Sequence, residues 1–395
     1  MPIVLLIPFT AKQVKPKHEI SEILDLYKNG FLQKHKTSNH VLRTLNALQI
    51  CRTSALGGHV FTCKECGSVE NRYNSCRNRH CPKCQQVAKE RWIMERESEL
   101  LNVPYFHIVF TLPHELNLLA KKHPKQVYGA LFRASWQTID IFAKDPKHIG
   151  AKTGMTSVLH TWGEQLSLHP HLHCIVPGGG LNPQGKWVFP KKYAKTSKRN
   201  IKYLFPKKAL SMVFRAKFMA ELRNELEIPQ QIAKAVMGKN WVVYAKRPFF
   251  GPKQVIEYLG RYTHKIAISN HRLVNIEKGK VEFKYKDYRS GGHYREMTLE
   301  ASEFIRRFCL HILPPGFMKM RHYGILASRN KAVDLNKAKE FFGLEKWVKQ
   351  KVDWETIARE KLGVNVFQCK HCGKNSLELV QSINPGRAPP VNGAK

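Results

Sequence analysis

Two histidines separated by one apolar residue stand within residues 169–176, which read HPHLHCIV. Because side chains alternate along a β-strand, His171 and His173 are expected on one face, with Leu172 and Cys174 on the other. Two imidazoles about 7 Å apart along one strand can bind one divalent cation. The spacing therefore predicts a metal site, and Mn²⁺ or Mg²⁺ would suit a site open to phosphate oxygens. The alternative is that surface histidines contact DNA or solvent.

A third ligand for this cation is expected from the preceding segment. Residues 156–162 read as a strand, and His160 on it could face His171 across a hairpin with residues 163–169 as the connection. Glu164 and Gln165 in that connection are alternatives that would offer oxygen ligands.

Two tyrosines form a second candidate for chemistry. Pro252 favours a helix start, and residues 253–265 then place Tyr258 and Tyr262 four positions apart, on the same helix face. Tyrosine can act as a covalent nucleophile, but its ordinary pKa near 10 makes it weak at neutral pH. A cation on the scissile phosphate would offset this weakness. The alternative is that both rings belong to an apolar face beside Val255 and Leu259.

The cysteines predict structural metal. Two Cys-x-x-Cys pairs, Cys63 with Cys66 and Cys81 with Cys84, have the spacing of a four-thiolate zinc site. A possible second zinc could use the nearby ligand types Cys51, His59, Cys76 and His80, which could instead pack or cap loops. A single pair near the C-terminus, Cys369 and Cys372, has no visible fourth ligand.

The charge of the chain indicates a polyanionic partner. Lys and Arg number 66 against 30 Asp and Glu, a formal net charge of +36 over 395 residues. Nucleic acid fits best, because each neutralised phosphate releases counterions. The residues expected to contact DNA are Arg77, Arg79, Lys83, Arg261 and Lys265.

Several other classes of protein are disfavoured. No apolar run approaches the roughly 20 residues that span a bilayer, and we expect no membrane partner. A cytoplasmic location follows, where the ten cysteines would stay reduced. Residues 180–186 resemble a phosphate-binding loop, but Trp187 stands where a hydroxyl is required, so we expect a turn and no nucleotide cofactor.

Strands interspersed with helices and hairpins, one of them around residues 278–280, predict an α+β fold with a central antiparallel sheet. The expected divisions are a helical arm (1–50), a zinc-binding DNA-contact module (51–98), a catalytic domain (99–328, with a helical segment near 206–228), a C-terminal helical region (329–375) and a disordered tail (376–395).

Taken together, these motifs resemble the HUH superfamily, and more closely the two-tyrosine transposases of the IS-ninety-one type of bacterial insertion sequence. The similar segments are 51–59, 74–85, 160–163, 169–180, 258–270 and 313–317. The resemblance implies an HUH endonuclease domain with flanking helices, and His171 and His173 as metal ligands. His160 would correspond to the third histidine of plasmid relaxases, and Tyr258 and Tyr262 to the two nucleophiles.

The same resemblance implies rolling-circle transposition in bacteria, at the nucleoid, through 5′-phosphotyrosine intermediates on single-stranded DNA. Some relatives keep a single essential tyrosine, which leaves the need for Tyr258 open. Two other functions remain as alternatives. One is a replication initiator or relaxase with the same chemistry, and the other is a non-catalytic zinc-dependent DNA-binding regulator.

Overall fold

A five-stranded antiparallel sheet forms the centre of the computed structural model, which describes residues 15–191, 203–246, 248–249, 254–255, 258, 260 and 264–386. Its strand order is β12-β4-β5-β3-β8. The strands are β3 (Tyr105–Thr111), β4 (Gly154–Trp162), β5 (Leu168–Pro177), β8 (Val243–Ala245) and β12 (Met320–Gly324). The α+β fold with a central antiparallel sheet is therefore confirmed.

The sheet is buried on both faces where its middle strands run. Every residue of β4 is buried, and six of the seven residues of β3 are. One face packs against helices α5 (Pro124–Lys144) and α7 (Lys207–Arg223), flanked by α4 (Asn117–Lys122) and α8 (Gln230–Met237). The predicted helical segment near 206–228 is α7.

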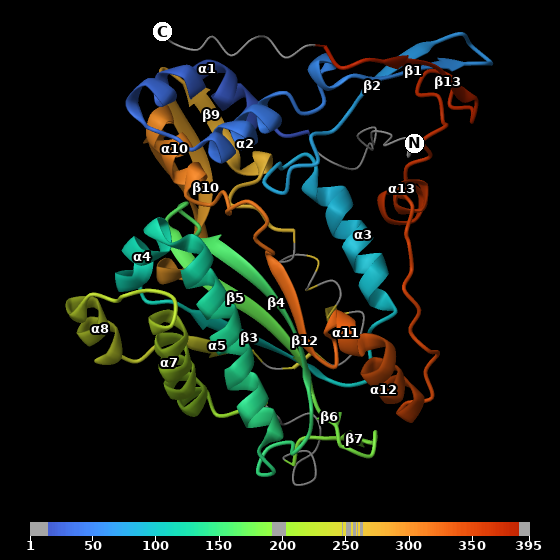
Figure 1. Ribbon diagram of the computed structural model, residues 1–395. Helices are drawn as coiled ribbons and strands as arrows, with labels where there is room; N and C mark the ends of the chain where they lie inside the picture. The colour runs from blue at the N-terminus through green and yellow to red at the C-terminus, as the bar shows by residue number, and fades with distance from the viewer. Residues whose placement is uncertain are drawn as a thin grey trace.

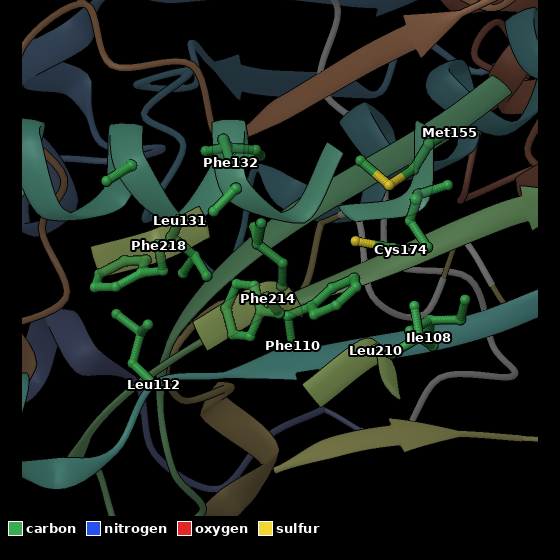
Figure 2. Close-up of a cluster of buried hydrophobic side chains, with 14 of the residues drawn as sticks. Ile108, Phe110, Leu112, Leu131, Phe132, Met155, Cys174, Leu210, Phe214 and Phe218 are labelled. Carbon is green, nitrogen blue, oxygen red and sulfur yellow. The ribbon is translucent and has the colours of Figure 1, made fainter. Parts of the chain in front are cut away.

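The core between this face and the helices is rich in aromatic rings, as Figure 2 shows. Phe110 of β3 lies with its ring centroid 4.7 Å from that of Phe214 on α7. Leu172 and Cys174 of β5 point into the same core and are fully buried. Alternation along β5 therefore sends the histidines of this strand to the opposite face.

A second antiparallel sheet lies toward the ends of β4 and β5 (Figure 1). It consists of β9 (Leu273–Glu277), β10 (Lys280–Asp287) and β11 (His293–Glu300), and shares a core with α1 (Ile20–Lys34), α2 (Asn39–Gln49) and α10 (Ala301–Cys309). The predicted hairpin around residues 278–280 is confirmed as the β9–β10 turn. The helices of the predicted N-terminal arm, α1 and α2, are part of this core.

The third sheet joins distant parts of the chain. Strands β1 (Gly58–Cys63) and β2 (Val69–Tyr73) form a hairpin, and β13 (Leu377–Ile383) pairs with β1 in antiparallel register (Figure 1). The prediction of a disordered tail from residue 376 is therefore wrong for β13, because its backbone is hydrogen-bonded to β1. Residues 387–395 lie outside the described residues.

The remaining elements connect these sheets. Helix α3 (Gln85–Glu97) leaves the β1–β2 region and packs on the histidine face of the central sheet. The C-terminal helices are α11 (Ser328–Asn330), α12 (Asn336–Phe341) and α13 (Trp354–Leu362). Strands β6 (Gly180–Leu181) and β7 (Trp187–Val188) enclose a turn, as predicted in place of a phosphate-binding loop. Among the helices that the structure describes, none combines the length and the apolar character that crossing a bilayer requires.

We expect Phe110→Ala to lower the free energy of unfolding by about 3–5 kcal/mol, because the ring is fully buried against α7 and its removal leaves a cavity. Urea denaturation followed by circular dichroism measures the change. The control Leu118→Ala removes a side chain that is 55% exposed and should change stability by less than about 0.5 kcal/mol. Equal effects of the two substitutions would contradict this placement of the core.

Candidate active site

The β4–β5 hairpin brings three histidines together. His160 on β4 is directly opposite His171 on β5, and Val158 is opposite His173, so all three histidines share one face. One ring nitrogen from each histidine lies within 4.8 Å of the others. The predicted position of His160 across the hairpin is confirmed. Glu164 and Gln165 line the neighbouring cavity, and Glu164 is not part of this cluster.

Burial keeps two of these imidazoles uncharged at neutral pH. Nδ1 of His171 donates a hydrogen bond to the backbone oxygen of His169 at 2.7 Å, which leaves the Nε2 lone pair available. Burial lowers the pKa of His171 to about 4 and holds the pKa of His173 well below its ordinary range. At neutral pH both rings are therefore uncharged, as metal coordination requires.

A fourth histidine, His107 on β3, connects this cluster to a tyrosine. Its Nε2 lies 2.9 Å from Nδ1 of His173, and its Nδ1 lies 2.8 Å from the hydroxyl oxygen of Tyr258. His107 is buried, and burial lowers its pKa to about 3. His107 is not among the residues predicted from the sequence. The only signal was a lone histidine within a predicted buried strand, with no spacing that relates it to His173 or Tyr258.

Tyr258 belongs to a segment whose described residues, Gln254, Val255, Tyr258 and Gly260, are helical. Its ring packs on Phe249, with 4.6 Å between centroids. A Cβ at position 260 would lie 2.4 Å from the side chain of Ile93 on α3, so glycine allows the two segments to approach closely. The second predicted nucleophile, Tyr262, and the predicted DNA contact Arg261 lie outside the described residues.

A cavity of about 640 Å³ opens beside the three histidines. One wall is the histidine face of the central sheet, and the opposite wall comes from β10 and the turn after it. Aromatic and basic side chains line it, namely Trp162, Tyr244, Lys265, Tyr285, Lys286 and Tyr288. Lys265, a predicted DNA contact, also lies 3.3 Å from Glu164.

Eight cysteines form two four-cysteine groups that differ from the predicted sets. Cys51, Cys76, Cys81 and Cys84 make the first cysteine group, and Cys63, Cys66, Cys369 and Cys372 make the second cysteine group. The prediction that Cys63 and Cys66 share one site with Cys81 and Cys84 is therefore wrong. The predicted second set of Cys51, His59, Cys76 and His80 is also wrong, because neither histidine belongs to a group.

The β1–β2 hairpin explains the division. Cys63 and Cys66 lie at the turn of this hairpin, whereas Cys51 precedes it and Cys76 follows it at the open end. Strand β1 is six residues long, so the two ends are about 17 Å apart, too far for one ion. Cys81 and Cys84 lie directly before α3 and join the open end.

His80, which is outside both cysteine groups, and two of the predicted DNA contacts, Arg79 and Lys83, make contacts within the protein. Nε2 of His80 accepts a hydrogen bond from the backbone N–H of Leu313, and His59 lies within β1. The guanidinium group of Arg79 donates to the backbone oxygens of residues 313, 314 and 317. Lys83 forms an ion pair with Glu19 at 2.5 Å. Arg77 is exposed, with a positive φ of 51°.

Known proteins are similar to this chain over most of its length. A family model described as "Transposase zinc-binding domain" matches residues 23–112, and one described as "Putative transposase" matches residues 154–333. A protein of Sinorhizobium fredii named "Putative transposase y4qJ" is 40% identical to this chain. The similarity covers 94% of this chain and 97% of that protein. The "Transposase for insertion sequence element IS801" of Pseudomonas savastanoi pv. phaseolicola is 30% identical to this chain. The similarity covers 84% of this chain and 82% of that protein. The chain belongs to the IS-ninety-one type of insertion-sequence transposases.

The zinc-binding match of this transposase includes the first cysteine group but ends long before Cys369. The match to residues 154–333 includes all three clustered histidines and Tyr258. A solved structure titled "Conjugative Relaxase TrwC in complex with OriT Dna. Metal-free structure." is 12% identical and covers 66% of the transposase and 74% of its own chain. Its TM-score of 0.23 is too low to support a mechanism.

We expect His107→Ala to weaken Mn²⁺ binding about 10–100-fold, because the substitution removes the partner that orients His173. Isothermal titration calorimetry measures the affinity. The control His114→Ala changes a histidine whose side chain is 83% exposed and should leave the affinity unchanged. An unaltered affinity in His107→Ala would show that His107 does not position the cluster.

Proposed function

We propose that this transposase cleaves and rejoins single-stranded DNA at element ends through 5′-phosphotyrosine intermediates, as an HUH nuclease acting by a rolling-circle route. The observation that carries the proposal is the hydrogen-bonded path from the histidine cluster through His107 to the hydroxyl of Tyr258. It supports a nucleophile and a metal site that act on one phosphate.

The histidine cluster fits a divalent cation, Mg²⁺ or Mn²⁺. Three imidazoles on adjacent strands converge, with 4.5 Å between the ring centroids of His160 and His173 and 4.9 Å between those of His171 and His173. The hydrogen bond from His171 to the backbone leaves its Nε2 directed away from that contact. A cation bound here would withdraw charge from the scissile phosphate and orient it for in-line attack.

The hydrogen-bonded path then has a defined direction. When Nε2 of His173 serves as a ligand, its proton must be on Nδ1, which donates to Nε2 of His107. His107, which is uncharged, must then carry its own proton on Nδ1 and donate it to the phenol oxygen of Tyr258. This donor stabilises negative charge on that oxygen, and so favours the phenolate that attacks phosphorus.

The reaction conserves bond energy. The Tyr258 phenol gives its proton to water, its oxygen forms a bond to phosphorus while the bond from phosphorus to the 3′ oxygen breaks, and the 3′ oxygen leaves and takes up a proton from water. The 5′ end remains linked to the tyrosine. A free 3′ hydroxyl can later attack this phosphotyrosine and rejoin the strand, so no nucleotide cofactor is required. We assign the second transfer to Tyr262 from its place four residues along the sequence.

The cavity favours single-stranded DNA as the substrate. Tyr244 and Tyr288 line it with side chains that are 48% and 69% exposed, and Lys286 lies 5.3 Å from the ring of Tyr288. Unpaired bases stack on exposed aromatic rings, while nearby ammonium groups hold the phosphates. Paired bases cannot offer their faces in this way.

Zinc in the first cysteine group would hold the N-terminal module together. The Sγ atoms of Cys51 and Cys84 are 3.6 Å apart, and those of Cys51 and Cys81 are 3.5 Å apart. Four thiolates at about 2.3 Å from one zinc ion would be separated by about 3.8 Å, close to these values. The site lies at the start of α3, so zinc would fix the helix against which the Tyr258 segment packs.

A covalent-adduct assay tests the chemistry. Incubation with single-stranded DNA from an element end and Mn²⁺ should give a denaturation-resistant protein–DNA adduct. We expect Tyr258→Phe combined with Tyr262→Phe to abolish it, because no phenol oxygen then reaches phosphorus, and His171→Ala to reduce it at least about 100-fold. Tyr294→Phe, which alters an exposed tyrosine on β11, is the control and should leave it unchanged. Adduct formation by the double tyrosine variant would refute the nucleophile assignment.

Tyr288→Ala should weaken binding of a single-stranded oligonucleotide by about 1–3 kcal/mol, roughly 5–150-fold, through the loss of one stacking surface. Fluorescence anisotropy without divalent cation measures binding separately from cleavage. Tyr294→Ala removes a similarly exposed ring that does not line the cavity and should have little effect. The cavity would not be the path of the strand if both variants bound equally well.

A further inference from the structure

The second cysteine group joins the β1–β2 hairpin to the C-terminal part of the described chain. Cys63 and Cys66 come from the β1–β2 turn, and Cys369 and Cys372 come from the segment before β13. The Sγ atoms of Cys63 and Cys372 are 3.6 Å apart, and those of Cys66 and Cys369 are 3.7 Å apart. We propose that these four thiols bind a second structural zinc ion, which clasps the C-terminal segment to the N-terminal module. This proposal is independent of the proposed nuclease chemistry.

The distances favour a metal over disulfides. A disulfide requires an S–S separation of about 2.05 Å, which is far shorter than either measured value. Thiolates on a tetrahedral zinc ion, with Zn–S of about 2.3 Å, are about 3.8 Å apart. The measured pairs are within about 0.2 Å of this spacing. The group is therefore already arranged around the position of one ion.

The two halves of the site have the same local structure. In each half a Cys-x-x-Cys pair is followed by a glycine with positive φ, Gly67 at 69° and Gly373 at 74°. The N–H of each glycine donates to the oxygen of the first cysteine in its pair at 2.9 Å. The N–H of that first cysteine donates in turn to the oxygen five residues later, in Ser68 and in Lys374. Two matching knuckles that face each other are the usual form of a four-cysteine zinc site.

The apolar core beneath the site is too small to hold it closed. It contains Phe61, Leu377 and the two buried cysteines, with Trp354 at its edge. Fully burying an apolar side chain contributes about 1.5–3 kcal/mol, so two such residues do not offset the entropy of ordering the segment. A zinc ion supplies the missing stabilisation in small modules of this kind.

Further contacts join the C-terminal segment to the β1–β2 hairpin near the second cysteine group. The guanidinium group of Arg72 lies 4.6 Å from the ring centroid of Phe61 and donates to the backbone oxygen of Val366 at 2.7 Å. Lys374 pairs with Glu65 at 2.9 Å. Between α12 and α13 the chain has no regular structure over residues 344–353. Zinc binding, together with the pairing of β13 on β1, therefore holds the segment beyond this connection on the module.

The first test is zinc content. Cys369→Ser combined with Cys372→Ser should lower zinc from about two ions to about one per chain, measured by plasma mass spectrometry after gel filtration. The control Cys309→Ser removes a cysteine that belongs to neither group and should keep about two. A folded double variant that retains the zinc content of the unaltered protein would overturn the proposal.

A second test does not depend on the folding of that variant. A specific protease site placed within residues 344–353 of the otherwise unaltered chain allows the C-terminal segment to be cut free. The two fragments should elute together while zinc is bound and separate after treatment with a chelator. Separation of the fragments with the full zinc content still on the larger fragment would exclude a shared site.

Discussion

The register of the β4–β5 hairpin is the constraint on which the candidate site depends. A shift of one residue would turn His171 and His173 into the aromatic core and bring Leu172 to the cavity, so both faces of β5 specify the same pairing. The buried side of this strand, packed on α5 and α7, therefore fixes the positions of the imidazoles on the other side. Stability and proposed chemistry rest on the same hydrogen-bonded strands.

Contacts that start from this hairpin also position His107 and Tyr258. β3 lies beside β5 and brings His107 to His173, and His107 in turn meets Tyr258. The Tyr258 segment packs on α3, which begins directly after Cys84 of the first cysteine group. The zinc-binding module is thus mechanically linked to the candidate nucleophile, although no cysteine lies in the cavity. This linkage gives the proposed zinc a role in orienting the helix as well as in folding the module.

Local patterns predicted the parts of the site that depend on local geometry. Strand alternation and a short connection were enough to place His160 opposite His171. Local patterns could not predict which cysteines group together, because Cys63 meets Cys372 only after the intervening chain has folded. His107 is a single histidine in a strand, and its two partners are set by strand order and by packing of a distant helix. The Pro-rich sequence after residue 384 suggested a tail and obscured β13, whose side chains are mostly exposed.

Diffraction at the manganese edge would locate the bound ion and the DNA strand in the same crystal. Crystals of the variant lacking both tyrosine hydroxyls, grown with Mn²⁺ and a single-stranded element end, would hold the uncleaved complex. We expect one anomalous peak in contact with a ring nitrogen of each of His160, His171 and His173 and with an oxygen of the phosphodiester, beside the ring of residue 258. A manganese ion bound elsewhere, or a strand whose phosphates pass outside the cavity, would contradict it.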